Sequence, residues 1–123
     1  MTNEPAHERE SLRATELLDL GELTIRSERE GDVHTMALTG ELDLATADAV
    51  QAELERIEAT DVTSIVLDLK GLTFMDSTGV RLLVSAHARS RADTGRLSLL
   101  RGPAAVQRVM ELSGVDVLLP FAD

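Results

Sequence analysis

The sequence predicts a small α/β fold with a mixed sheet and helices packed on it. Three observations lead to this prediction. Apolar and polar residues alternate early in the chain, as in half-buried strands. Later, apolar residues recur at helical spacing in three segments. Short apolar runs rich in branched residues separate these segments, which is typical of buried parallel strands. The length of 123 residues suits one domain.

The first 20 residues are predicted to form a flexible N-terminal extension, which precedes a single domain over residues 21–123. The extension is polar and acidic, contains one proline and has no sustained period. Only "TELLDL", residues 15–20, is expected to form a short helical turn.

An antiparallel hairpin is predicted to open the domain. In "ELTIRSE" (22–28) and "DVHTMALTG" (32–40), apolar side chains alternate with their neighbours. Gly31 and Asp32 between the two runs are typical hairpin turn residues.

A helix and a central strand follow the hairpin. In "ATADAVQAELERIEA" (45–59), four apolar residues at steps of three and four place one apolar face on a helix. Asp43 or Thr46 is expected to cap its start. The next run, "VTSIVLDL" (62–69), is predicted to be a strand buried in the middle of the sheet.

The rest of the chain repeats the alternation of helix and strand. "STGVRLLVSAHARSR" (77–91) is predicted to be a helix whose apolar stripe holds Val80, Leu83, Val84 and His87. The strand "RLSLLR" comes next. "PAAVQRVMELSG" has proline at the expected first helical position and Gly114 after the end. "VDVLLPF" (115–121) is predicted to be the last strand, which gives the order β-β-α-β-α-β-α-β.

Composition excludes several classes of function. No apolar run approaches the roughly 20 residues of a membrane helix, and the first residues do not resemble a secretory signal. With no cysteine, neither disulfides nor thiolate metal sites can form. The net charge of −10 disfavours nucleic acid as a partner. We therefore expect a cytoplasmic protein without metal or cofactor, although the acidic surface could equally favour a basic protein partner or merely keep the protein in solution.

The stretch "FMDSTGV" (74–80) is the most unusual part of the chain, because it places polar residues between a predicted strand and a predicted helix. Asp76 suits the N-cap position. Ser77 would lie in the first turn with its hydroxyl facing solvent. Gly79 lacks a side chain, so that a partner backbone or ligand could approach closely. A helix start of this composition costs helix propensity, which indicates either a binding site or a tolerated capped start.

Catalysis at this serine is not supported by the sequence. A nucleophilic serine needs a base within hydrogen-bond reach, and His87 lies ten residues further on, about 15 Å along a helix. A phosphoacceptor role for Asp68 would need an acidic pair after the first strand and a late lysine, but the chain's one lysine is Lys70. No phosphate-binding loop of the form G-x-x-x-x-G-K-[ST] occurs. We expect no enzymatic activity.

Receiving a phosphoryl group from another protein requires only an exposed hydroxyl. A phosphate at Ser77 would be favoured by the helix N-terminus, and Asp76 would partly cancel this benefit. In an interface the same charge would have to be desolvated and would meet like charges. The fold would tolerate the modification and a complex would not.

Two stretches, "LTGELDLATA" (38–47) and "IVLDLKGLTFMDSTGV" (65–80), resemble the anti-sigma factor antagonists, the bacterial members of the STAS domain family. The resemblance covers roughly residues 21–123 and implies a STAS-like mixed sheet of four to five strands with about three to four helices packed on it. It also implies that the protein binds an anti-sigma factor with serine kinase activity and so releases a sigma factor.

The resemblance further implies that the kinase phosphorylates Ser77, that the complex then dissociates, and that a phosphatase reverses the modification. Asp43, Asp76, Ser77, Thr78 and Gly79 match the family's partner-binding surface. The alternative within the family is an unphosphorylated scaffold subunit of a transporter or of a stress-sensing complex.

Overall fold

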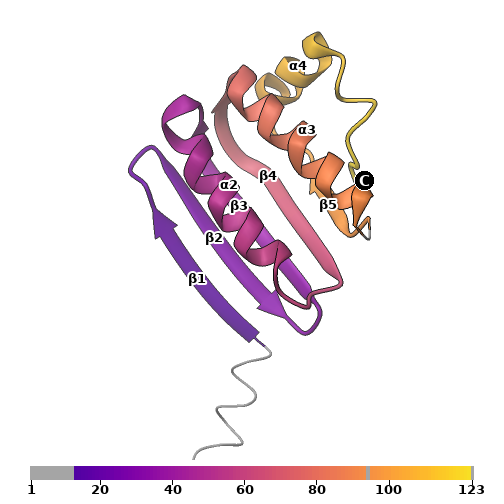
Figure 1. Ribbon diagram of the computed structural model, residues 1–123. Helices are drawn as coiled ribbons and strands as arrows, with labels where there is room; N and C mark the ends of the chain where they lie inside the picture. Colours follow the sequence, from indigo (N-terminus) through magenta and orange to yellow (C-terminus); the bar gives the residue numbers. More distant parts are fainter. Residues whose placement is uncertain (1–12, 94, 123) are drawn as a thin grey trace, which may run out of the picture.

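The computed structural model describes residues 13–93 and 95–122 and contains one five-stranded mixed sheet (Figure 1). The strands lie side by side in chain order, from β1 to β5. The first three pair antiparallel, and β3, β4 and β5 pair parallel. The strands are β1 Arg13–Asp19, β2 Leu23–Glu30, β3 Val33–Leu42, β4 Ser64–Met75 and β5 Leu97–Leu100, and the helices are α2 Leu44–Glu58, α3 Ser77–Ala92 and α4 Ala104–Ser113.

Strand β1 corrects the prediction for the start of the chain. Residues 13–19 pair with β2 from Arg13↔Glu30 to Asp19↔Thr24, whereas a helical turn was expected at residues 15–20 within a flexible extension. The alternating pattern of this strand is weak because it lies at the edge of the sheet, where even Leu17 and Leu18 stay largely exposed. The part of the predicted extension that covers residues 1–12 lies outside the described residues.

The end of the chain also differs from the prediction. Residues 115–121 form turns and a single bridge between Phe121 and Leu99, not a strand. The observed order is therefore β-β-β-α-β-α-β-α, in place of the predicted β-β-α-β-α-β-α-β. Pro103 stands at the N-cap of α4, one residue before the expected position, and Gly114 ends the helix with a left-handed φ of 76° as expected.

The hairpin of β2 and β3 is confirmed. Its two-residue turn is formed by Gly31 and Asp32, and Glu30 pairs with Val33 on either side of it. Gly31 has a φ of 63°, the left-handed conformation that glycine adopts without strain.

Strand β4 is longer than predicted because two bulges interrupt its alternation. Ala37 pairs with Asp68 and Thr39 with Gly71, so one residue of β3 lies opposite two residues of β4. A second shift follows between Gly40 and Glu41. The buried positions of β4 are therefore irregularly spaced, and the strand continues beyond Leu69 to Met75. Because of the two extra residues, β3 and β4 end level with each other.

Helices α2 and α3 lie across one face of the sheet and both begin at the same end of it (Figure 1). The predicted apolar face of α2 is confirmed, because Ala47, Val50, Leu54 and Ile57 are all buried. The predicted stripe of α3 is only partly correct. Its buried side chains include Leu82 and Ala86, and Val84 is exposed, because α3 contacts both α2 and α4 and its buried face is turned toward them.

One buried polar side chain, His34, lies in the core beneath α2. Both of its ring nitrogens are without a hydrogen-bond partner among the described residues. Burial lowers the pKa of His34 below its ordinary value of 6.5, and the nearby Arg56 adds to this effect while Glu53 opposes it. Arg56 is held by Glu53 and by Glu16 of β1, at 2.6 and 2.7 Å. The imidazole is therefore buried in its neutral form.

The burial of His34 predicts a loss of stability in mild acid. The unfolded chain binds a proton near pH 6.5 and the folded protein only at lower pH, so the free energy of unfolding should fall as the pH drops through 6.5. His34→Leu should reduce this fall, and should not lower stability at neutral pH because no hydrogen bond is lost. Urea unfolding at several pH values measures both effects. An unchanged pH dependence in the variant would contradict the prediction.

The pairing of β1 with β2 predicts different thermal stabilities for two shortened chains. A chain that begins at residue 21 loses the pairing with β2 and the Glu16–Arg56 ion pair, and exposes the edge of β2. It should melt several degrees lower than the full chain and should associate at high concentration. A chain that begins at residue 13 is the matched control and should behave like the full chain. Melting curves and light scattering compare the three, and equal stability of all of them would show that β1 contributes nothing.

Candidate functional site

The predicted site residues gather where β3 and β4 end side by side. Leu42 is paired with Met75, and the backbone N–H of Asp76 donates to the carbonyl of Leu42 at 3.3 Å. Each strand leads directly through an aspartate into a helix, Asp43 into α2 and Asp76 into α3. We call this region, residues 41–46 and 74–79, the Ser77 edge.

Asp43 is held in place by a capping box. Its carboxylate accepts from the backbone N–H of Ala45 at 3.0 Å, and its own N–H donates to the buried Thr46 hydroxyl at 3.1 Å. These contacts satisfy backbone groups at the start of α2 that have no partner within the helix. The expectation of a cap at this point is confirmed, with Asp43 as the N-cap residue.

Asp76 has the corresponding role in α3. Its carboxylate accepts from the N–H of Thr78 at 2.9 Å, which is the predicted N-cap. Ser77 is the first residue of the helix, and its side chain is exposed as expected. The Ser77 hydroxyl makes no hydrogen bond to any residue that the structure describes, whereas Asp76 and Thr78 are half-buried. The serine is thus the freest polar side chain of this turn.

Gly79 has a different role from the predicted one. It is buried, and a Cβ at this position would lie 2.5 Å from Cγ of Met75 and 3.1 Å from a methyl of Leu42. The space that was expected to admit a partner backbone is filled by the protein's own core. Glycine is needed there because the first turn of α3 packs closely on the ends of both strands.

Acidic side chains surround Asp43. Carboxylate oxygens of Glu22, Glu41 and Asp43 lie within 4.8 Å of one another, and the two glutamates are exposed. Repulsion by Asp43, and next by Glu41, raises the pKa of Glu22 above its ordinary value of 4.5. The Ser77 edge is therefore bordered by concentrated negative charge. The two glutamates were not predicted, because Glu22 reaches this edge only through the pairing of β2 with β3.

The histidines of the described residues cannot act on Ser77. His87 follows it by ten residues in the same helix, about 15 Å away along the axis. His34 is the second residue of β3, about 26 Å along the strand from Leu42. His7 lies outside the described residues. No histidine of the described residues is thus within reach of Ser77.

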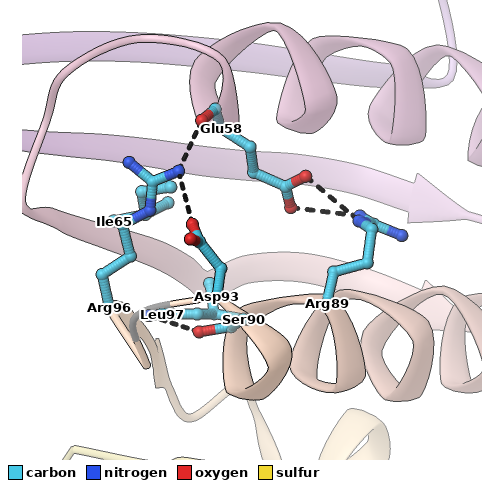
Figure 2. A pocket seen from close by; sticks show the side chains of 7 residues that line it. All are labelled: Glu58, Ile65, Arg89, Ser90, Asp93, Arg96 and Leu97. Carbon is cyan, nitrogen blue, oxygen red and sulfur yellow. Dashed lines mark hydrogen bonds and ion pairs between the residues drawn. The ribbon is translucent and has the colours of Figure 1, made fainter.

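A separate cavity of about 220 Å³ lies at the other end of α3 and is lined by charged and apolar side chains (Figure 2). Each guanidinium that faces it already has partners. Arg89 donates to both carboxylate oxygens of Glu58 at 3.0 and 3.1 Å, and Arg96 donates to Asp93 and to the backbone carbonyls of Glu58 and Val62. Arg96 thereby connects the end of α2 to the start of β5. The two arginines at this cavity thus hold parts of the fold together, and the cavity is remote from Ser77.

The family model described as "Mlab, STAS domain" matches residues 25–120. An anti-sigma F factor antagonist from Paenibacillus polymyxa is 31% identical over 102 residues, which cover 82% of this chain and 87% of that protein.

Two solved structures are also similar. SpoIIAA, an anti-sigma factor antagonist, in its unphosphorylated form is 27% identical, with a TM-score of 0.62 and coverage of 89% of each chain. The phosphorylated form of Bacillus SpoIIAA is 26% identical, with a TM-score of 0.57 and coverage of 89% of this chain and 92% of that one. Among the described residues, no helix is long and apolar enough to span a membrane.

The capping box predicts that two substitutions at Asp43 will differ in their effect on the free energy of unfolding. Asp43→Ala removes both the cap and the charge, and should lower the free energy of unfolding by about 0.5–2 kcal/mol. Asp43→Asn keeps a capping oxygen and relieves the repulsion with Glu22 and Glu41, so it should leave stability nearly unchanged. Asp48→Asn, on an exposed turn of α2, is the control for loss of charge alone. Urea unfolding of the three variants is the measurement, and equal losses for Ala and Asn would show that the cap is unimportant.

Proposed function

The chain belongs to the STAS domain family of anti-sigma factor antagonists, and we propose that it binds an anti-sigma factor and is switched off by phosphorylation of Ser77. In this proposal the anti-sigma factor is itself the serine kinase. The unmodified protein captures it, which frees a sigma factor. A separate phosphatase removes the phosphate and restores binding.

The free, exposed hydroxyl of Ser77 is the observation that carries this proposal. It stands on the first residue of α3 and makes no hydrogen bond to the described residues, so a kinase could reach it without unfolding the helix. Its neighbour Asp76 is committed to the cap, and Thr78 is half-buried. Ser77 is therefore the best phosphoryl acceptor in this turn.

Local electrostatics support a modification that leaves the fold intact. A phosphate carries about −1.5 to −2 charges, and the N-terminus of α3 would favour it by roughly 0.3–1 kcal/mol in water. The carboxylates of Asp76 and Asp43 oppose it at this exposed edge. In a complex the same phosphate would lose its water, and with it the screening from these carboxylates, at a cost of several kcal/mol. Each 1.4 kcal/mol weakens binding about tenfold, so one phosphate suffices to dissociate the partner.

The similar proteins support the same function. The Paenibacillus polymyxa relative is an anti-sigma F factor antagonist, and SpoIIAA is known in both unphosphorylated and phosphorylated forms. A scaffold subunit of a transporter or stress-sensing complex is the alternative within the family. It would leave Ser77 unmodified, so the experiment that tests the switch also separates the two functions.

Variants of Ser77 test the switch directly. Ser77→Ala should bind the anti-sigma factor like the unmodified protein and should not be phosphorylated. Ser77→Asp should fold normally and bind at least about tenfold more weakly, because it brings a charge to the interface, although a smaller one than phosphate. Ser85→Asp, on an exposed position further along α3, is the matched control and should bind normally.

The protein is incubated with purified candidate anti-sigma factors, ATP and magnesium, and mass spectrometry then locates the modified residue. Affinity is measured by calorimetry before and after modification. Normal labelling of Ser77→Ala would show that another residue is phosphorylated, with Thr78 the first alternative. Labelling of the isolated protein by ATP alone would indicate an enzyme in place of a kinase substrate.

A further inference from the structure

We propose that Leu44 and Phe74 are the apolar anchors with which the Ser77 edge holds the anti-sigma factor, and that the partner receives them in an apolar groove bordered by lysine or arginine. This inference rests on the proposed function and adds residues that neither the motif nor the comparisons assign.

Both side chains are large, apolar and exposed to solvent, and their exposure does not stabilise the fold. Leu44 is 76% exposed and Phe74, one of only two aromatic residues in the chain, is 48% exposed. A single exposed leucine is ordinary on a protein surface. Here two large apolar side chains lie at the same end of the sheet as Ser77. Buried aromatic or aliphatic anchors commonly dominate the affinity of protein interfaces.

Strand register places both residues at one end of the sheet. Phe74 pairs with Glu41, and the next pair along the two strands is Leu42 with Met75. Asp43 and Asp76 follow as the two N-caps, so Leu44 occupies in α2 the position that Ser77 occupies in α3. Both helices begin at the same end of the sheet (Figure 1). Leu44 thus lies at the neighbouring helix start and Phe74 three residues before the serine, on the strand that leads to it.

The fold itself does not need either side chain to be apolar. The buried face of α2 is formed by Thr46, Ala47, Val50, Leu54 and Ile57, and Leu44 is outside it. Phe74 alternates with the buried Met75 and therefore projects away from the helices. Substituting either residue by a polar one should leave the core untouched.

Charge identifies the kind of partner. Glu22, Glu41 and Asp43 border the two anchors, and their mutual repulsion would be relieved by positive side chains. A second copy of this chain, with a net charge of −10, would bring the same carboxylates face to face. The anti-sigma factor is therefore the occupant we infer.

Leu44→Ser and Phe74→Ser are tested for binding to the anti-sigma factor by calorimetry. Each should weaken binding about tenfold or more, and the double variant about a hundredfold, with unchanged melting temperature. Leu112→Ser is a matched control, because Leu112 is also 76% exposed but lies near the end of α4. Val84→Ser, at 39% exposure on α3, is the control for Phe74. Both controls should bind within about twofold of the unchanged protein. Raising the salt concentration should weaken anti-sigma factor binding by the unchanged protein and by every variant.

The outcomes separate this inference from the proposed function. If the unchanged protein binds and Ser77→Asp does not, but both anchor variants bind within about twofold, the anchors are wrong and the switch stands. If no anti-sigma factor binds the unchanged protein, the proposed function itself fails. Sedimentation of the anchor variants provides the remaining test. Loss of a dimer, in place of lost partner affinity, would make a second copy the occupant and overturn the inference.

Discussion

The parallel pairing of β3 with β4 fixes the position of every residue in the site. Met75 lies opposite Leu42 at the last rung of this ladder, and the two strands leave the sheet at the same level. Each then passes through an aspartate into a helix, so both N-caps and both first turns lie at one edge. The hydrogen bond from Asp76 to the Leu42 carbonyl closes the ladder directly below Ser77. Stability of the core and exposure of the serine thus depend on the same contacts.

The Ser77 edge combines a rigid support with free side chains. Leu42, Met75 and Gly79 are buried against one another, and Asp43 and Asp76 are engaged in caps. Ser77, Leu44 and Phe74 extend from this support into solvent, so they can be modified or covered without disturbing what lies beneath them. This division suits a protein whose binding must change while its fold does not.

Local features of the site could be predicted from the sequence, and features that depend on distant pairing could not. Asp76 and Ser77 were placed correctly because an N-cap and a first helical residue depend on only a few neighbours. Gly79 was assigned to the surface because the closeness of Met75 and Leu42 appears only when α3 is packed on both strands. Glu22 joins the acidic cluster through a hairpin partner 19 residues away, at Glu41. Strand β1 was missed because its own pattern is weak and its pairing with β2 determines its structure.

The two bulges of β4 affect how sequences of this fold can differ in length. At each bulge one residue more lies in β4 than in β3, and the residues on either side still face the correct way. An insertion or deletion of one residue at such a point could be absorbed within the strand, while the aspartates at the two strand ends stay level. The spacing between "GELD" and "FMDSTG" along the chain is therefore less constrained than their spacing in the folded molecule. Searches for sequences of this family should allow small differences in length between the two motifs.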